Sequence, residues 1–173
     1  MSERVVETGG WQRPVADEPK GPLVARQRRY DIVTHSPEET LAFGRELARF
    51  LKPPCLVLLE GELGSGKTVL TKGIAAGLGA ASESEVNSPT FALVHEYKGE
   101  SKVYHVDLYR IESAQELATL GLEEMFGELA TAIVEWGEKL EAHAPLPRFE
   151  VRLEHRGEND RHILVEELTH RLI

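Results

Sequence analysis

The chain has 173 residues, of which 41% are hydrophobic and 28% are charged, so it is long enough for one globular domain, and its length argues against two full domains. The net charge of −9 argues against binding of nucleic acid through overall charge, and no apolar run approaches the roughly 18 residues of a membrane-spanning helix. The single cysteine, Cys55, excludes an intrachain disulfide, and the polar N-terminus lacks the apolar segment of a signal peptide, so we expect a cytoplasmic protein.

Residues 1–28 are predicted to form a flexible tail, because they combine three glycines and three prolines with no apolar period. Residues 29–173 are expected to form the folded domain. Residues 1–30 carry six basic and four acidic side chains, a balance of +2, so the remainder carries −11. Any direct contact with nucleic acid is therefore expected from the tail or from a local patch.

Predicted strands and helices alternate along the folded domain. Apolar and β-branched runs predict the strands, and capping boxes that begin at Ser36 and Ser113 predict two of the helices. The expected elements are a strand at 29–33, a helix at 37–51, a strand at 55–59, a helix from 67 to about 79, a hairpin of 91–97 and 102–108, a helix from 114 to 121, a strand at 131–134, and a hairpin of 149–154 and 162–168. This order predicts an α/β domain with a mixed sheet.

Residues 61–68 match the pattern G-x-x-x-x-G-K-[ST] and stand between a predicted strand and a predicted helix. Glycines let the backbone curl around a phosphate group with its amides pointing inward, and the helix N-terminus adds a positive end. Lys67 is placed to contact the β- and γ-phosphates, and Thr68 to ligate Mg²⁺. All eight residues are predicted nucleotide contacts: Gly61, Glu62, Leu63, Gly64, Ser65, Gly66, Lys67 and Thr68. The expected fold is therefore a single-domain α/β fold with a P-loop NTPase-like mixed β-sheet flanked by helices.

Hydrolysis requires further groups beside a phosphate loop. Asp107 and Glu135 each end an apolar predicted strand, where a carboxylate can hold Mg²⁺ directly or through water. Thr90 lies in a loop that can reach the γ-phosphate. The alternative roles are an exposed strand-end carboxylate for Glu135 and ordinary turn residues for Asp107 and Thr90.

Three other side chains have simpler expected roles. His105 shares the predicted strand face of Asp107, but no metal-ligand spacing joins it to another histidine, so a packing or surface role is expected. Cys55 opens a buried strand and is expected in the core. Trp136 can pack on a nucleotide, on a partner or in the core.

The distribution of arginine separates the possible functions. Arg110 is the only arginine between the phosphate loop and Arg148, whereas phosphoryl transfer to a bound acceptor usually recruits several cations. This favours a weak ATPase completed by a partner, and the lack of an Asn-Lys-x-Asp motif favours adenine over guanine. The alternatives are a small-molecule kinase of the nucleotide-kinase type, with residues 107–110 as acceptor site, and a nucleotide-sensing regulatory subunit.

Five segments, in order and spacing, closely resemble the TsaE (YjeE) family, the bacterial ATPases of tRNA threonylcarbamoyladenosine biosynthesis. The resemblance runs from about Tyr30 to about Val165. The segments are residues 61–68, residues 88–91 with 93–97, residues 103–110, residues 116–117 with 120–124, and residues 133–136.

The resemblance implies an ATPase with little activity of its own that uses ATP and Mg²⁺. It implies docking on threonylcarbamoyl transferase and its non-catalytic paralogue, the TsaD and TsaB type subunits, with tRNA reached only through the complex. The expected catalytic residues are Lys67, Asp107, Glu135 and Thr90. The expected metal ligands are Thr68, Glu135 and Asp107. Outside the loop, the expected nucleotide contacts are Thr40, Trp136 and Arg161.

Overall fold

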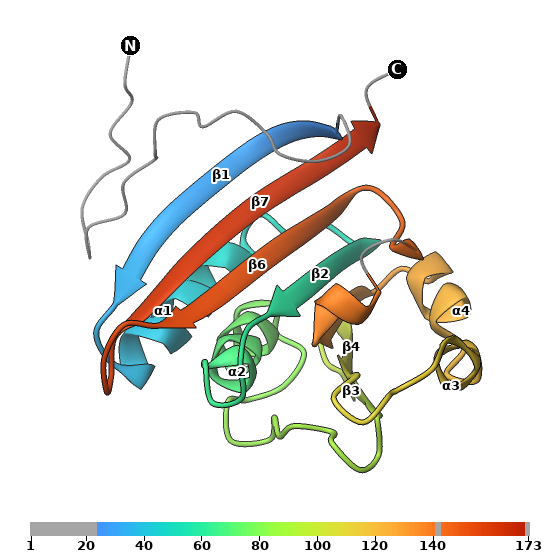
Figure 1. The fold of residues 1–173 in the computed structure, drawn as a ribbon, viewed down its shortest axis with the longest axis horizontal. Helices are drawn as coiled ribbons and strands as arrows, with labels where there is room; N and C mark the ends of the chain where they lie inside the picture. Colours follow the sequence, from blue (N-terminus) through green and yellow to red (C-terminus); the bar gives the residue numbers. More distant parts are fainter. Residues whose placement is uncertain (1–23, 141–142, 172–173) are drawn as a thin grey trace.

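The computed structural model describes residues 24–140 and 143–171. Its strands are β1 (Val24–Thr34), β2 (Cys55–Glu60), β3 (Val94–Lys98), β4 (Lys102–Asp107), β5 (Thr131–Glu135), β6 (Arg148–His155) and β7 (Arg161–Arg171). Its helices are α1 (Pro37–Ala48), α2 (Lys67–Gly77), α3 (Ala114–Ala118), α4 (Leu122–Gly127) and the 3₁₀ turn η1 (Gly137–Lys139). These strands form one sheet in the order β1-β7-β6-β2-β5-β4-β3 (Figure 1).

The sheet is mixed. Strand β2 lies parallel to both β5 and β6, and β4 lies parallel to β5, whereas β3 and β7 pair in antiparallel fashion with their neighbours. The carboxyl ends of β2, β4 and β5 therefore meet at one edge, where the loops that follow them carry the predicted site residues. The predicted single-domain α/β fold with a mixed sheet flanked by helices is confirmed.

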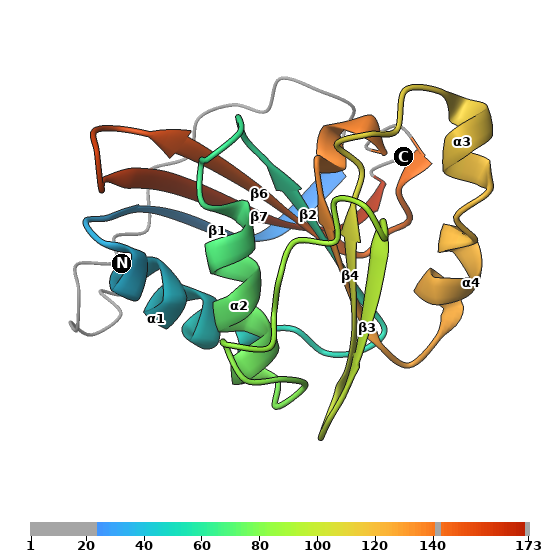
Figure 2. The same ribbon diagram turned by 90° about the horizontal axis from the view of Figure 1, so that it is seen from below.

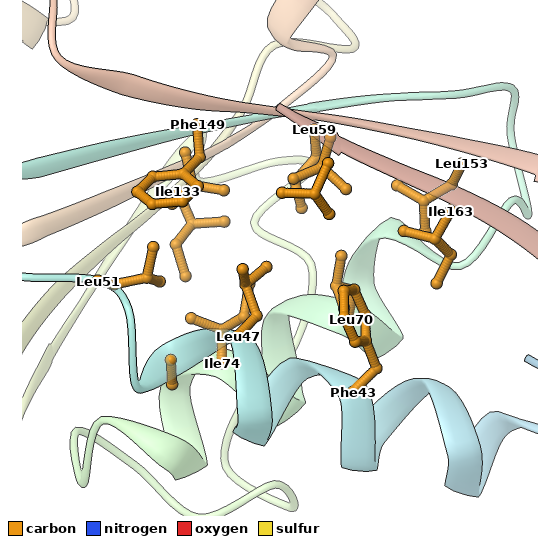
Figure 3. Packing of buried hydrophobic residues seen from close by; sticks show 14 of the residues in the cluster. Phe43, Leu47, Leu51, Leu59, Leu70, Ile74, Ile133, Phe149, Leu153 and Ile163 are labelled. Carbon is orange, nitrogen blue, oxygen red and sulfur yellow. The ribbon is translucent and has the colours of Figure 1, made fainter. Parts of the chain in front are cut away.

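Each face of the sheet has its own apolar core. Side chains alternate along β2, so Val57 and Leu59 join the core under α1 and α2, while Leu56 and Leu58 join the core that includes Leu122 of α4. Figure 2 shows α1 and α2 side by side, and Figure 3 shows their apolar side chains meeting those of the sheet. Burial on both faces explains why β2 is a continuous apolar run.

Helices α1 and α2 approach each other closely because glycines line their contact. A Cβ added to Gly44 of α1 would lie 2.7 Å from the Leu70 carbonyl oxygen and 2.9 Å from the Cα of Gly73, both in α2. A Cβ at Gly77 of α2 would likewise lie 2.7 Å from that of Ala48. The first turn of α2 follows the phosphate loop, so this contact also determines where that turn lies.

Several element boundaries differ from the prediction, and three of the differences have a clear physical reason. Strand β1 begins at Val24, five residues before the expected start, because its ladder to β7 continues as far as Arg171. Strand β3 begins at Val94 because Leu93, at φ 67°, belongs to a turn. The helix expected to end at Gly121 already ends at Ala118, and an unpredicted short helix, α4, follows Gly121, which caps it in the left-handed region. Residues 1–23 of the predicted tail lie outside the described residues.

None of the helices in the described ranges is both long and apolar enough to cross a membrane.

Candidate active site

Residues 61–68 form a curled loop between β2 and α2. Gly66 caps α2 with φ 102°, and Gly61 has φ 155°, and residues other than glycine rarely adopt either backbone angle. A Cβ on Gly61 would also lie 2.5 Å from Ser65 Oγ and 2.6 Å from the Leu153 carbonyl oxygen. The strand, glycine loop and helix predicted around a phosphate site are therefore all present.

Lys67 lies within the loop that it closes. Its Nζ donates hydrogen bonds to the carbonyl oxygens of Gly61 at 2.6 Å and Glu62 at 2.9 Å. Burial lowers the pKa of Lys67, and nearby carboxylates, chiefly that of Glu135, oppose this effect. The Lys67 ammonium is therefore held at the loop by uncharged carbonyl oxygens and lies near the Glu135 carboxylate.

Thr68 and Glu135 meet below the loop. Thr68 Oγ1 donates to Glu135 Oε1 at 2.8 Å, and His105 Nε2 lies 2.7 Å from the same oxygen. Both Glu135 and His105 are buried. Of the two roles expected for His105, the surface role is wrong because the ring is fully buried; besides packing in the core, the ring is also hydrogen-bonded to a predicted site residue. The two-residue spacing from Asp107 was the available signal, since it places both side chains on one strand face.

The oxygen atoms at this position suit a magnesium ion. Mg²⁺ prefers hydroxyl and carboxylate oxygens and usually takes one or two carboxylates together with phosphate oxygens. Asp107 and Glu135 are register partners on adjacent strands, and Thr68 contacts Glu135 directly. Across the described part of the chain, no three His, Cys, Asp or Glu side chains cluster as a metal site. A cation here would therefore also need the phosphates of a nucleotide.

Asp107 joins two loops at the end of β4. Its Oδ2 accepts hydrogen bonds from Ser88 Oγ at 2.7 Å and Thr90 Oγ1 at 3.2 Å, and its Oδ1 accepts one from the Tyr109 amide at 2.9 Å. The structure thus brings Thr90 to Asp107. Ser88 was not predicted, although a second hydroxyl two residues before Thr90 was visible in the sequence.

Trp136 follows Glu135 in a strained turn. It has φ 60°, which is uncommon for a residue other than glycine and is typical of functional sites. The Lys67 Nζ lies 4.3 Å from the centre of its ring, and the Tyr109 ring lies 5.1 Å away. Trp136 is half-buried: it contacts these two side chains of the site and also packs against the edge of the core that includes Leu122.

Lys139 connects the turns that follow β4 and β5. Its Nζ donates to the carbonyl oxygens of Leu108 at 2.9 Å, Tyr109 at 2.9 Å and Ile111 at 2.7 Å. The ammonium therefore holds the turn after Asp107 against the segment after Glu135. Nothing in the local sequence around Lys139 indicates this contact.

The two remaining predicted nucleotide contacts differ in position. Arg161 reaches the phosphate loop, where its Nη2 donates to the Gly64 carbonyl oxygen at 3.4 Å. Thr40 is buried, and its Oγ1 lies 2.7 Å from Thr34 Oγ1. The structure therefore brings Arg161 to the loop, whereas the Thr40 hydroxyl is hydrogen-bonded to Thr34 across the connection between β1 and α1. Nucleotide contact remains a prediction for both.

Comparisons with known proteins identify the family of the chain. The family model described as "Threonylcarbamoyl adenosine biosynthesis protein TsaE" matches residues 34–163. The tRNA threonylcarbamoyladenosine biosynthesis protein TsaE of Bacillus subtilis is 42% identical over 131 residues, 75% of this chain and 80% of that protein. The protein of the same name from Treponema pallidum is 33% identical over 133 residues, 77% of this chain and 97% of its own length.

A solved structure gives the same result for the fold. The crystal structure of Bacillus subtilis YdiB superposes with a TM-score of 0.67 at 32% identity, and the match covers 83% of this chain and 88% of that one. The fold is that of a P-loop NTPase. Together with the family match, this confirms the resemblance noted in the sequence: the chain belongs to the TsaE family of tRNA threonylcarbamoyladenosine biosynthesis proteins.

Proposed function

We propose that this chain binds and hydrolyses ATP in tRNA threonylcarbamoyladenosine biosynthesis, and that a partner protein is needed for full activity. The observation that carries the proposal is the convergence at one edge of the sheet. There the phosphate loop, the Thr68–Glu135 hydrogen bond of 2.8 Å and the buried Asp107 carboxylate lie on adjacent elements. Phosphoryl transfer from a nucleotide needs a phosphate cradle, oxygen ligands for a metal and a group that orients water.

Each side chain then has a defined task. The loop amides and Lys67 bind the β- and γ-phosphates, and the ammonium exchanges carbonyl oxygens for phosphate oxygens. Thr68 and Glu135 would hold Mg²⁺, which when bound neutralises negative charge on the phosphates. Asp107 orients the attacking water, and its hydrogen bond to Thr90 places that hydroxyl beside it.

ATP is the proposed nucleotide because the sequence contains no Asn-Lys-x-Asp motif of the kind that reads guanine. Trp136 and Arg161 are proposed to flank the bound nucleotide. The ring of Trp136 lies against Lys67, and the guanidinium of Arg161 contacts the backbone of Gly64.

Two features near the loop support partner dependence. Arg110, the only arginine between the loop and Arg148, lies 5.0 Å over the ring of Phe91. Large apolar side chains are also exposed around the site, with Leu63 72%, Phe91 86% and Tyr109 46% accessible. Exposed apolar groups of this kind mark protein contacts, and a docked protein can supply cations that the chain lacks.

The proposed partners are threonylcarbamoyl transferase and its non-catalytic paralogue, the TsaD and TsaB type subunits, in the cytoplasm. Contact with tRNA is proposed to occur only through that complex. The −11 balance of residues 31–173 is consistent with this division, because the body of the protein has no overall attraction for a phosphate backbone.

Phosphate release from ATP, measured with and without the transferase pair, tests the proposal. Slow release by the chain alone should rise at least about tenfold with the pair. Lys67→Ala should abolish nucleotide binding, and Glu135→Ala should bind ATP yet lose about 100-fold in turnover. Lys72→Ala is the matched control, because it also removes a lysine from α2 and should leave turnover unchanged.

Two results would contradict the proposal. Transfer of phosphate from labelled ATP to a nucleoside or metabolite would identify a kinase instead. Normal hydrolysis by Glu135→Ala would remove that carboxylate from the metal site.

A further inference from the structure

The histidine bonded to Glu135 has no assigned role in the site. His105 is fully buried, with an exposed fraction of 0%, and its Nε2 lies 2.7 Å from Glu135 Oε1. Its other ring nitrogen, Nδ1, is also buried and has no hydrogen-bond partner among the described residues. A core histidine held only for packing would gain nothing from this arrangement, since burial of an unpaired polar atom costs free energy.

The position of His105 follows from the parallel pairing of β4 and β5. Side chains alternate along β4, so His105 lies on the same face as Val103, in the core beneath α2. His105 is the register partner of Ile133, two residues before Glu135 on the neighbouring strand. The ring therefore reaches diagonally across the two strands to the Glu135 carboxylate.

The chemistry of the pair fixes which nitrogen carries the proton. An ionised carboxylate only accepts hydrogen bonds, so His105 must donate to Glu135 through an Nε2–H group. In the neutral ring, Nδ1 is then an unprotonated acceptor. An N–H at Nδ1 would instead be a buried donor without a partner, which is the costlier arrangement.

We infer that His105 is a positioning residue that holds the Glu135 carboxylate against Thr68, the orientation that the proposed magnesium site requires. This inference rests on the proposed function. Thr68 and His105 both contact Oε1, from α2 and from β4, so the carboxylate is fixed from two directions. Partners of this kind around a metal-binding carboxylate typically change metal affinity 10- to 100-fold when they are removed.

Three variants separate the hydrogen bond from the shape of the ring. His105→Gln places its amide nitrogen as many bonds from Cα as Nε2 and keeps the donor. His105→Asn has the same amide, but its nitrogen corresponds to Nδ1 and cannot reach Glu135. Val103→Ala is the matched control, because it removes buried volume from the same face of β4 without contact to the site.

The measurement is binding of a fluorescent N-methylanthraniloyl ATP as a function of Mg²⁺, repeated in EDTA, on variants that thermal unfolding shows to be folded. We expect His105→Asn to raise the Mg²⁺ midpoint at least about tenfold, and His105→Gln and Val103→Ala to stay within about threefold of the wild type. Affinity in EDTA should be the same for all four proteins.

Several outcomes would overturn the inference. An unchanged midpoint in His105→Asn would show that the hydrogen bond does not position Glu135. An equal loss in His105→Gln or Val103→Ala would assign the effect to volume. If the wild type shows no Mg²⁺-dependent binding of the probe, the proposed function fails as well, whereas normal binding by wild type and His105→Asn alike refutes only the role of His105.

Discussion

The close contact between α1 and α2 should make Gly44→Ala destabilising, although alanine is the better helix former. In an exposed helix interior, this exchange stabilises by about 1 kcal/mol. Here the new Cβ would meet three backbone atoms of α2, at 2.7 Å from the Leu70 carbonyl oxygen and at 2.9 Å from Gly73 Cα and the Ile74 nitrogen. Ordinary carbon–oxygen contacts are about 3.3 Å or longer, so the helices must separate by roughly 0.6 Å.

Backbone atoms cannot rotate away, so the overpacking cost belongs at the upper end of its usual range, about 3 kcal/mol. After the propensity gain of about 1 kcal/mol, the expected net loss is about 2 kcal/mol of unfolding free energy. For a domain of this size, that corresponds to a fall in Tm of about 4–8 °C.

Urea unfolding followed by circular dichroism measures the loss directly, as a lower midpoint with an unchanged m value. Gly127→Ala is the matched control, because a Cβ at the end of α4 meets nothing within 4 Å, and it should change stability by less than about 1 kcal/mol. If Gly44→Ala is as stable as the wild type, or is stabilised like the control, close approach does not determine this helix contact.

Three further outcomes are expected. Burial raises the pKa of the Cys55 thiol from 9.0 to about 12, so the folded protein holds less of the reactive thiolate at pH 8. Iodoacetamide at pH 8 should therefore alkylate Cys55 about 1,000-fold more slowly in the folded protein than in the unfolded chain. Mass spectrometry gives both rates, and a difference below tenfold contradicts the reasoning. Binding of ATP should draw the Lys67 ammonium from the ring of Trp136 and change its fluorescence, measured in a Trp11→Phe background; an unchanged spectrum at saturation argues against this movement. Lys139→Met should lower the partner-stimulated kcat about tenfold and change KM less than threefold, because the three carbonyl contacts of Lys139 hold the ends of two strands and do not touch nucleotide. Steady-state kinetics that match the wild type would show that Lys139 does not support the site.

Local chemistry explains why much of the fold could be predicted. The apolar run 55–59 has to be buried on both faces, and the structure places it near the middle of the sheet as β2. The predicted caps at Ser36 and Ser113 are present, with hydrogen bonds from the Glu39 and Glu116 amides to the serine hydroxyls at 3.1 Å. The two glutamate side chains accept from the amides of His35 and Glu112, one residue before each serine. Each of these features is contained within a few consecutive residues.

Element ends were less predictable, because neighbouring strands determine them. Strand β1 extends to Val24 since β7 offers a pairing partner there, and Arg28 and Glu167 on the two strands form an ion pair of 3.3 Å. The intrinsic properties of residues 24–28 contain no sign of that partner. Likewise, the glycine at position 44 is unremarkable in a helix until α2 lies against it.

The phosphate loop could be predicted without a structure, because eight consecutive residues contain all the backbone freedom, charge and hydroxyl chemistry that such a loop needs. The sequence also indicated that Asp107 and Glu135 end strands, and it identified the family. The contacts of Glu135 with Thr68, 67 residues away, and with His105, 30 residues away, became visible only once the strands were assembled into the sheet. Those contacts depend on the order and register of β4, β5 and β2, which are set by burial of whole strand faces rather than by any local pattern.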